Sequence, residues 1–261
     1  MGQWQLLKTE ISCGVGTIFL DNGQRFNTLH SECILELKSA LKALELNDKV
    51  GCIVLTGEPG ESFAVGANIA EMKDFKPLDG WKFSQLGQGL FDQIEMAKKP
   101  VIAALNGITM GGGCDLALAC DIRLASERLK IAHPGAKLGI ITGFCGTQKL
   151  PRIVGRNKAK EIFMTSKVYS ATEALQMKLV EQVYPAAQFL DSVNAYAQQI
   201  AAQPPMALQL AKKLLNAAEN VCLNNGQVME LGAFASLFPR SGAMERIEDF
   251  FAEHSRIDSP E

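Results

Sequence analysis

The sequence predicts an α/β fold, with one main domain followed by a helical region, and three observations support this. In the first half of the chain, short runs of β-branched and other apolar residues alternate with longer segments of helical periodicity, which is typical of βα units that feed one sheet. Beyond Pro185 only helical patterns follow. With 261 residues, 47% of them hydrophobic, the chain is long enough to bury a sizeable core.

The first predicted elements are a strand at residues 15–20, a helix at 31–46 and a strand at 52–56. Apolar residues recur along 31–46 at near-helical spacing, and Ser31 suits a helix start because its hydroxyl can accept a backbone N–H. The run Cys52–Thr56 is continuously apolar. A strand of that kind is expected to be covered on both faces.

The next elements follow the same alternation. Lys99-Pro100 ends a helix that begins near Trp81, since the residue before proline disfavours helical backbone. Strands are predicted at 101–105 and 122–125, and a helix between them starts within Gly111–Gly113 and runs to Ala119.

Helices are predicted at residues 187–202, 205–218 and 226–237, with no further strand. The domain organisation that follows is a core over residues 1–200 and a carboxy-terminal helical region over residues 201–261.

Composition favours a small-molecule partner. Lys and Arg (26) nearly balance Asp and Glu (28), without runs of like charge, so a nucleic-acid or membrane surface is not expected. No signal peptide and no apolar stretch of spanning length is apparent, so a cytoplasmic protein is expected. The seven cysteines are odd in number and form no C-x-x-C pair, which predicts reduced core thiols and no metal site.

Two glycine-containing turns precede predicted helices, at residues 63–69 and 106–115. A helix amino terminus leaves N–H donors unpaired, and glycine lets backbone approach a ligand closely. Each turn is therefore a candidate oxyanion site. The residues alone support a second interpretation equally well. In that interpretation the glycines are needed only because the backbone adopts positive φ or because a helix packs closely on a strand.

Several segments together resemble the crotonase (enoyl-CoA hydratase/isomerase) superfamily. They run in family order from about residue 8 to 254 and comprise F-A-V-G-A-N-I-A-E-M at 63–72, K-P-V-I-A-A-L-N-G at 99–107, G-G-G-C-D-L-A at 111–117, L-G-I at 138–140, G-T-Q-K-L-P-R-I-V-G at 146–155, and A-x-x-A at 171–174 followed by Leu179-Val180.

The resemblance implies a spiral of ββα units and a carboxy-terminal region that helps form homotrimers, which often pair as hexamers. It also implies an oxyanion hole made by the N–H groups of Ala67 and Gly112, and coenzyme A held in a bent shape beside the backbone of residues 64–67. Coenzyme A belongs to the substrate, so no separate cofactor is expected. The implied substrate-binding residues are Ala64, Val65, Gly66, Asn68, Ile69, Gly111, Gly135 and Gly143.

The chain departs from the family pattern at the acid–base positions. A hydratase of this family uses two glutamates; the first is replaced here by Asp115 and the second by Gly135. His133 lies two residues before Gly135, and it is either a proton-transfer group or a satisfied wall residue. Thr142 stands where some ring-condensing or ring-cleaving members place an aspartate, so those chemistries are not expected.

The predicted function is that of an enoyl-CoA hydratase/isomerase-type enzyme that stabilises a thioester enolate, with Asp115 as the acid–base residue. Loss of one well-placed carboxyl costs roughly 10²- to 10⁴-fold, so ordinary hydration is disfavoured relative to isomerisation, an atypical hydration or dehydration, or decarboxylation. The alternative is a catalytically impaired acyl-CoA-binding or scaffold subunit. The acyl pocket is expected to involve residues 72–90, Met110, Phe144 and Phe234.

Overall fold

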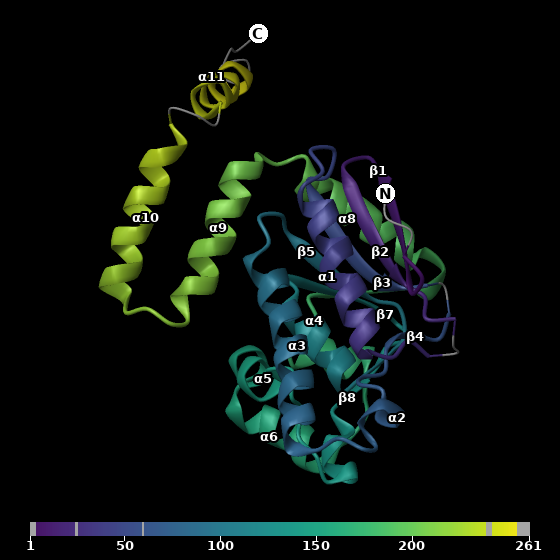
Figure 1. The fold of residues 1–261 in the computed structure, drawn as a ribbon. Helices are drawn as coiled ribbons and strands as arrows, with labels where there is room; N and C mark the ends of the chain where they lie inside the picture. Colours follow the sequence, from purple (N-terminus) through teal and green to yellow (C-terminus); the bar gives the residue numbers. More distant parts are fainter. Residues whose placement is uncertain (1–3, 24–25, 59, 239–241, 255–261) are drawn as a thin grey trace. The chain divides into compact units, whose positions relative to one another are not determined.

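The computed structural model describes residues 4–23, 26–58, 60–238 and 242–254. The chain divides into two compact units, Met1–Ala202 and Gln203–Glu261 (Figure 1). The predicted helical region, residues 201–261, includes residues 239–241 and 255–261, which lie outside the described residues.

The first unit contains a six-stranded sheet in the order β1-β2-β3-β5-β7-β10, in which all neighbours are parallel except the β1–β2 hairpin. A second sheet has the order β4-β6-β8-β9. The strands are β1 (Leu7–Ser12), β2 (Val15–Leu20), β3 (Cys52–Gly57), β4 (Ser62–Ala64), β5 (Val101–Leu105), β6 (Ile108–Met110), β7 (Ile122–Ser126), β8 (Lys130–Ala132), β9 (Tyr169–Ser170) and β10 (Gln182–Tyr184).

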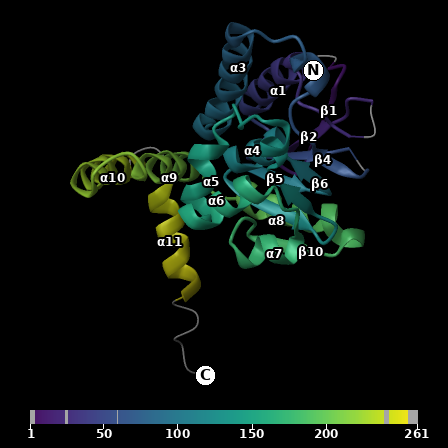
Figure 2. The ribbon, with the colours of Figure 1, turned by 90° about the horizontal axis from the view of Figure 1, so that it is seen from below.

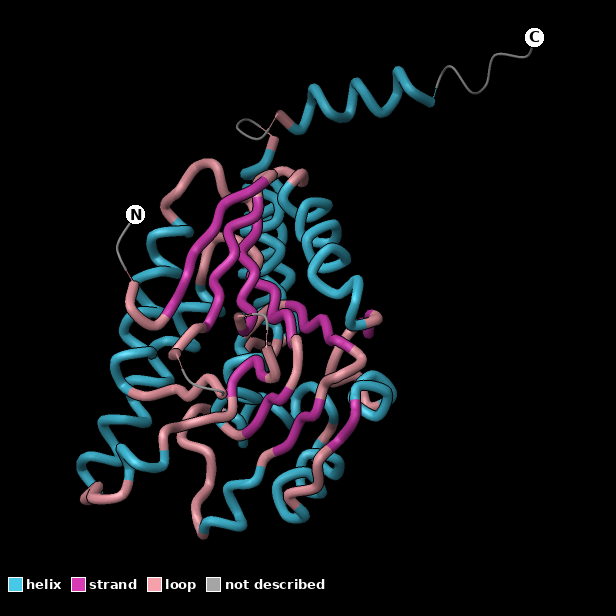
Figure 3. Tube along the Cα trace, turned by 90° about the vertical axis from the view of Figure 1, so that its right-hand side faces the viewer, coloured by secondary structure: helices cyan, strands magenta, loops and turns pink. Residues whose placement is uncertain are grey.

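Consecutive strand pairs feed both sheets. The pairs β3–β4, β5–β6 and β7–β8 each place their longer strand in the six-stranded sheet and their shorter strand in the four-stranded one. Figure 3 shows the two groups of strands, with the longer ones above the shorter ones. Helical segments follow each pair. This repetition is the spiral of ββα units expected from the resemblance, and it confirms the α/β fold class.

The helices of the first unit are α1 (Ser31–Glu45), α2 (Ile69–Met72), α3 (Pro77–Met96), α4 (Gly112–Ala119), α5 (Gly146–Val154), α6 (Arg156–Thr165), α7 (Ala171–Gln176) and α8 (Phe189–Ala201), with short 3₁₀ turns η1 (Pro134–Leu138) and η2 (Ala186–Gln188). Helix α3 begins four residues before the predicted Trp81, because Pro77 suits the first helical position and the Asp79 carboxylate accepts the N–H of Lys76.

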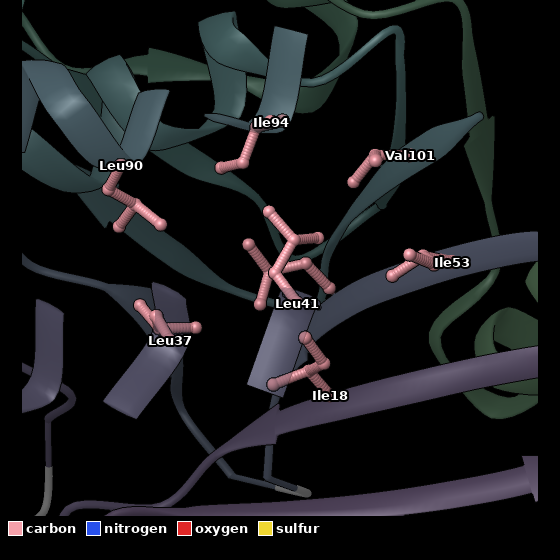
Figure 4. Close-up of a pocket in the computed structure, with 8 residues that line it drawn as sticks. Ile18, Leu37, Leu41, Ile53, Leu90, Ile94 and Val101 are labelled. Carbon is pink, nitrogen blue, oxygen red and sulfur yellow. The ribbon is translucent and has the colours of Figure 1, made fainter. Parts of the chain in front are cut away.

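The larger sheet is covered on both faces, as the apolar run of β3 predicts. Ile53 and Leu55 pack toward α1 and α3, whereas Cys52 and Val54 pack against α8. Figure 2 shows α1 and α3 on one side of the strands and α8 on the other. Figure 4 shows the first of these layers, where Leu41 of α1 lies among side chains from β2, β3, β5 and α3 around a void of only about 10 Å³.

The second unit consists of α9 (Pro205–Ala218), α10 (Leu223–Leu237) and α11 (Ala243–His254), of which α9 and α10 pack as a hairpin. Helix α10 begins at Leu223, three residues before the predicted Gly226. Large apolar side chains of this unit are exposed, among them Leu215, Leu223, Val228, Leu231 and Phe234.

Cysteine burial is only partly as predicted. Cys33, Cys52, Cys114 and Cys120 are buried, whereas Cys13 and Cys222 are exposed and Cys145 is half-buried. The exposed pair sit in a tight turn and at a helix boundary, where flanking apolar residues do not imply burial. Among the helices that the structure describes, none has both the length and the apolar character needed to cross a bilayer.

Candidate active site

The turn after β4 is fixed by backbone contacts on both sides. Gly66 adopts φ +98°, and its carbonyl accepts the N–H of Leu29 at 2.8 Å. The side chain of Asn68 then accepts the N–H of Ala70 at 3.0 Å and caps α2. The chain is thus held where Ala67 presents its backbone at the start of a short helix.

The turn after β6 is built in the same way and packs directly against the first. Gly111 has φ +50°, and its N–H donates to the carbonyl of Ala132 at 2.9 Å. A Cβ at Gly113 would overlap the carbonyl of Ala64, so glycine is required for α4 to approach β4 this closely. Close packing of the helix on the strand, which was the alternative left open by the sequence, therefore accounts for the glycine at position 113.

The N–H groups of Ala67 and Gly112 lie side by side. A Cβ built on Gly112 would be 3.4 Å from the Ala67 nitrogen, and one built on Gly66 would be 3.2 Å from the Gly112 nitrogen. Within the described ranges, neither N–H donates to another protein group. Both residues line the same cavity. Two unpaired donors on one cavity form a suitable site for a carbonyl oxygen that gains negative charge.

The cavity has a volume of about 440 Å³, within the range of small-molecule sites. Its wall is mainly apolar, and His133, Ser84 and Thr142 supply its polar side chains; no Asp, Glu, Lys or Arg is among the residues found to line it. The lining residues are Val65, Gly66, Ala67, Ile69, Met72, Phe75, Gly80, Phe83, Ser84, Gly111, Gly112, His133, Pro134, Gly135, Leu138, Ile140, Ile141, Thr142, Gly143 and Phe144.

Aromatic rings close the cavity on the side of α3. The ring of Phe144 lies 5.2 Å from that of Phe83 and 5.7 Å from that of Phe91, centroid to centroid. A Cβ at Gly87 would overlap the Phe144 ring, so this glycine of α3 makes room for it. The cavity is therefore walled by flat, rigid, apolar groups close to Gly112.

Asp115 is fully buried in α4, behind the cavity wall rather than on it. Its Oδ1 lies 2.9 Å from Nε2 of His133, a contact that is an ion pair when the imidazole is protonated. Its Oδ2 accepts a hydrogen bond from the hydroxyl of Thr142. Helix α4, the residue after β8 and the loop before α5 thus meet at one carboxyl group.

Burial raises the pKa of Asp115, and contacts with His133 and Thr142 offset only part of this effect. Burial also acts to lower the pKa of His133, but the neighbouring Cys114 thiol and Asp115 carboxyl outweigh it, so that the pKa of His133 is raised. Both shifts favour protonated forms. The pair therefore binds protons more tightly than two exposed groups would.

His133 follows β8, and its surroundings fit the wall residue that was one of the two alternatives, while its contact with Asp115 is also compatible with proton transfer. Its side chain is 2% exposed and its ring lies 4.5 Å from that of Phe163, as expected of a wall residue. It also contacts the Asp115 carboxyl and is part of the cavity lining.

Gly135 lies on the cavity but has no room for a side chain. A Cβ there would be 2.9 Å from the carbonyl oxygen of Ile140, which is a backbone group and not free to rotate away. Gly143 is fixed differently, since its carbonyl accepts hydrogen bonds from Ser84 Oγ and from Gln88 Nε2. The loop between η1 and α5 is thus tied to α3.

Of the residues named from the sequence, nine line the cavity, namely Val65, Gly66, Ala67, Ile69, Gly111, Gly112, His133, Gly135 and Gly143. Ala64, Asn68 and Asp115 do not, because Ala64 is a buried strand residue, Asn68 caps α2 and Asp115 is enclosed.

Of the residues expected to wall an acyl pocket, Met110 is not among the lining residues that the structure identifies for this cavity, whereas six others are, namely Met72, Phe75, Gly80, Phe83, Ser84 and Phe144. Phe234 belongs to the second unit. Ser84 lies within the expected range 72–90, and Thr142 lies on the cavity at the position where some family members place an aspartate. The hydrogen bonds of Ser84 with Gly143 and of Thr142 with Asp115 were not predicted, because they depend on how the 139–145 loop packs on α3 and α4.

Known proteins share this fold and much of this sequence. The family model described as enoyl-CoA hydratase/isomerase matches residues 10–256. A short-chain-enoyl-CoA hydratase of Clostridium acetobutylicum is 35% identical over 224 residues, which cover 86% of each chain. A crotonyl-CoA hydratase of Syntrophomonas wolfei is 34% identical, over 90% of this chain and 91% of the relative. The crystal structure of an enoyl-CoA hydratase from Bacillus anthracis has a TM-score of 0.91 at 30% identity and covers 95% of this chain and 97% of that one.

Proposed function

The chain belongs to the enoyl-CoA hydratase/isomerase family, and from this premise we propose that it is an enzyme that binds an acyl-coenzyme A thioester and stabilises the thioester enolate with the N–H groups of Ala67 and Gly112. The observation that carries the proposal is the pair of adjacent, unpaired backbone donors on one apolar cavity. Such donors are most effective where water is excluded, and removing one typically costs about 10²- to 10³-fold in kcat.

The acid–base chemistry in this proposal belongs to Asp115. Burial raises the pKa of this carboxyl, which makes it a stronger base toward a substrate proton than an exposed aspartate, and an enolate-forming reaction requires such a base. Gly135, which replaces the second glutamate of a family hydratase, supplies no second acid. One titrating carboxyl suits a proton shift along the acyl chain, or an atypical hydration or dehydration, better than ordinary hydration.

The lining of the cavity ranks the remaining reactions. A decarboxylase acts on an acyl group that carries a free carboxylate, and a buried carboxylate needs a cationic or hydrogen-bonding partner. Lysine and arginine are absent from the residues that the structure places along the cavity, and aromatic rings form much of the wall. We therefore favour an uncharged, unsaturated acyl group and place isomerisation ahead of decarboxylation.

The binding of the coenzyme A part follows from the resemblance. The backbone of Ala64, Val65 and Gly66, with Asn68 and Ile69 beside it, would hold the bent nucleotide portion as part of the substrate, and no separate cofactor is proposed. The proposed setting is the cytoplasm.

Assembly into a homotrimer or homohexamer is part of the same proposal. The exposed leucine, valine and phenylalanine side chains of α9 and α10 support it, because apolar surface of this kind is usually covered in an oligomer. Sedimentation of the full chain would distinguish a monomer, a trimer and a hexamer.

A catalytically impaired acyl-CoA-binding subunit is the second candidate. It is favoured by one observation, namely that the carboxyl of Asp115 is fully enclosed and does not line the cavity. Tight binding of acyl-CoA thioesters without any turnover would support this role.

The test compares the chain with its Gly112→Ala variant on crotonyl-CoA, a 3-enoyl-CoA and malonyl-CoA. The added methyl group would sit 3.4 Å from the Ala67 nitrogen and 3.1 Å from the Phe144 ring, so it occupies the space of the thioester oxygen. We expect turnover of the 3-enoyl thioester and a loss of about 10²-fold or more in the variant. Gly232→Ala is the matched control, because a Cβ there meets nothing within 4 Å. Unchanged turnover in Gly112→Ala would refute the oxyanion role.

A further inference from the structure

The carboxyl of Asp115 is closed off on every side that the structure describes around it. His133 faces Oδ1, and a Cβ at Gly146, the first residue of α5, would overlap that same oxygen. Oδ2 is covered by the hydroxyl of Thr142. A substrate carbon in the cavity therefore has no direct contact with the carboxyl that the proposed chemistry needs.

Thr142 connects the enclosed carboxyl to the cavity. It is half-buried and lines the cavity beside Gly143 and Phe144. Its hydroxyl donates to Asp115 Oδ2 and accepts the N–H of Phe144 at 3.2 Å. A hydroxyl has one donor and two acceptor positions, so one lone pair of Thr142 remains for a group in the cavity.

We propose that the Thr142 hydroxyl is a catalytic residue that carries protons between the substrate acyl chain and Asp115. The proposal rests on the proposed function, because it assumes an acyl thioester in this cavity. It assigns to Thr142 the contact with substrate and to Asp115 the role of the proton store behind it.

The step balances without any further reactant. The C–H bond at the α carbon breaks, and its electron pair enters the thioester enolate held by the two backbone N–H groups. The proton bonds to Thr142 Oγ1 while the Oγ1–H proton transfers to Oδ2 of the ionised Asp115. Before the return, the proton on Thr142 Oγ1, which lies on the cavity, exchanges with water. Transfer of the Oγ1 proton back to the α carbon then gives isotope exchange and transfer to the γ carbon gives isomerisation, while the proton on Asp115 returns to Thr142, so that all groups regain their starting states.

The surroundings of Asp115 suit a proton store. The raised pKa of this buried carboxyl lets it keep the proton between the two transfers, and His133 lies against Oδ1 and stabilises the ionised form. His133 itself is a weaker candidate for the contact with substrate, because its Nε2 faces Asp115 and its ring packs on Phe163.

The test measures deuterium incorporation at the α carbon of butyryl-CoA in D₂O, together with the affinity for butyryl-CoA by titration calorimetry. We expect exchange in the unmodified chain, a loss of about 10²-fold or more in Thr142→Val and Asp115→Asn, and near-normal exchange in Thr142→Ser, which keeps the hydroxyl. Affinity should change little in the three variants. Thr147→Val, at an exposed threonine five residues further on, is the matched control and should exchange normally.

The outcomes separate the two levels of the proposal. Binding and exchange in the unmodified chain with undiminished exchange in Thr142→Val would overturn the relay and leave the proposed function standing. No exchange in the unmodified chain, or no binding, would overturn the enolate function and the relay with it. Should Thr142→Val fail to fold, Thr142→Ser and Thr142→Ala decide, since the relay requires the first to exchange and the second to lose exchange.

Discussion

The two glycine turns and the group formed by Asp115, His133 and Thr142 serve one cavity, but they obtain their polar atoms differently. The turns contribute backbone N–H groups, which every residue except proline carries, and they need glycine only for space and positive φ. The second group depends on three particular side chains that meet from separate segments.

The difference shows which part of such a site the fold preserves. A backbone donor stays in place as long as the turn is intact, whereas a side chain can be exchanged without disturbing the fold. In the proposed function the chain keeps the backbone donors of the two turns, while Asp115 and Gly135 stand where the resemblance implies two glutamates.

The largest effect is expected from a change that distorts the turns themselves. In Gly113→Ala the new methyl group overlaps the carbonyl of Ala64 and pushes α4 away from β4. A shift of about 1 Å can cost about 100-fold in rate. We also expect a loss of about 1–3 kcal/mol in the free energy of unfolding from overpacking. Steady-state turnover and urea unfolding would measure both, and full activity at unchanged stability would contradict the packing described.

A new carboxyl at position 135 tests whether a missing side chain can simply be restored. We expect Gly135→Glu not to create efficient crotonyl-CoA hydration and to destabilise the chain by about 1–3 kcal/mol, because the Ile140 carbonyl occupies the space beside its Cα. Ala136→Glu, at the exposed neighbouring position, is the control and should retain wild-type stability. A gain of fast hydration in Gly135→Glu would show that the loop adapts and that only the glutamate was lacking.

The side-chain group also predicts how stability depends on pH. The pKa of Asp115 is raised above 3.8 by burial, and that of His133 is raised above 6.5, to about 10, because its thiol and carboxyl neighbours outweigh burial. A raised pKa means that the folded state binds more protons than the unfolded state. The contribution of each group to the free energy of unfolding therefore falls as the pH rises. Thermal unfolding between pH 4 and pH 10 should show a steeper fall in Tm for the unmodified chain than for Asp115→Asn, by a few degrees. Parallel curves would contradict this.

The smallest effect on activity is expected at the start of α7, a helix that contributes none of the residues found along the cavity. The side chain of Ser170 caps this helix, and Glu173 completes the capping box while its contact with Lys167 lowers the pKa of Glu173 to about 2. Ser170→Ala should cost about 1 kcal/mol in unfolding free energy and leave turnover unchanged. The contribution of Glu173 to the free energy of unfolding should be present above pH 4.5 and should disappear as the pH falls toward 2. Acid unfolding of the unmodified chain and of Glu173→Gln would test this.

The larger sheet and the long helices follow from the sequence because their signals are strong. A continuous apolar run at 52–56 gives a strand covered on both faces, and the apolar spacing from Ser31 gives α1. The short strands β4, β6 and β8 have three residues each, too few for a periodic pattern, and they form because their partners in the second sheet are present.

The candidate site likewise has one part that the sequence predicts and one part that it does not. The two turns are visible in the sequence, since glycines that stand between an apolar run and a helical pattern mark the start of a helix. The contact of Thr142 with Asp115 is not visible, because residues 115 and 142 meet only through the packing of α4, α5 and the loop before α5. The complete burial of Asp115 is a result of the same packing and has no local signal.

The most direct test of the central claim is a crystal structure of the chain with butyryl-CoA bound. The account predicts that the thioester oxygen accepts hydrogen bonds, at about 2.7–3.2 Å, from the N–H groups of both Ala67 and Gly112. A thioester oxygen that faces away from these two nitrogens, in a fully occupied cavity, would contradict it.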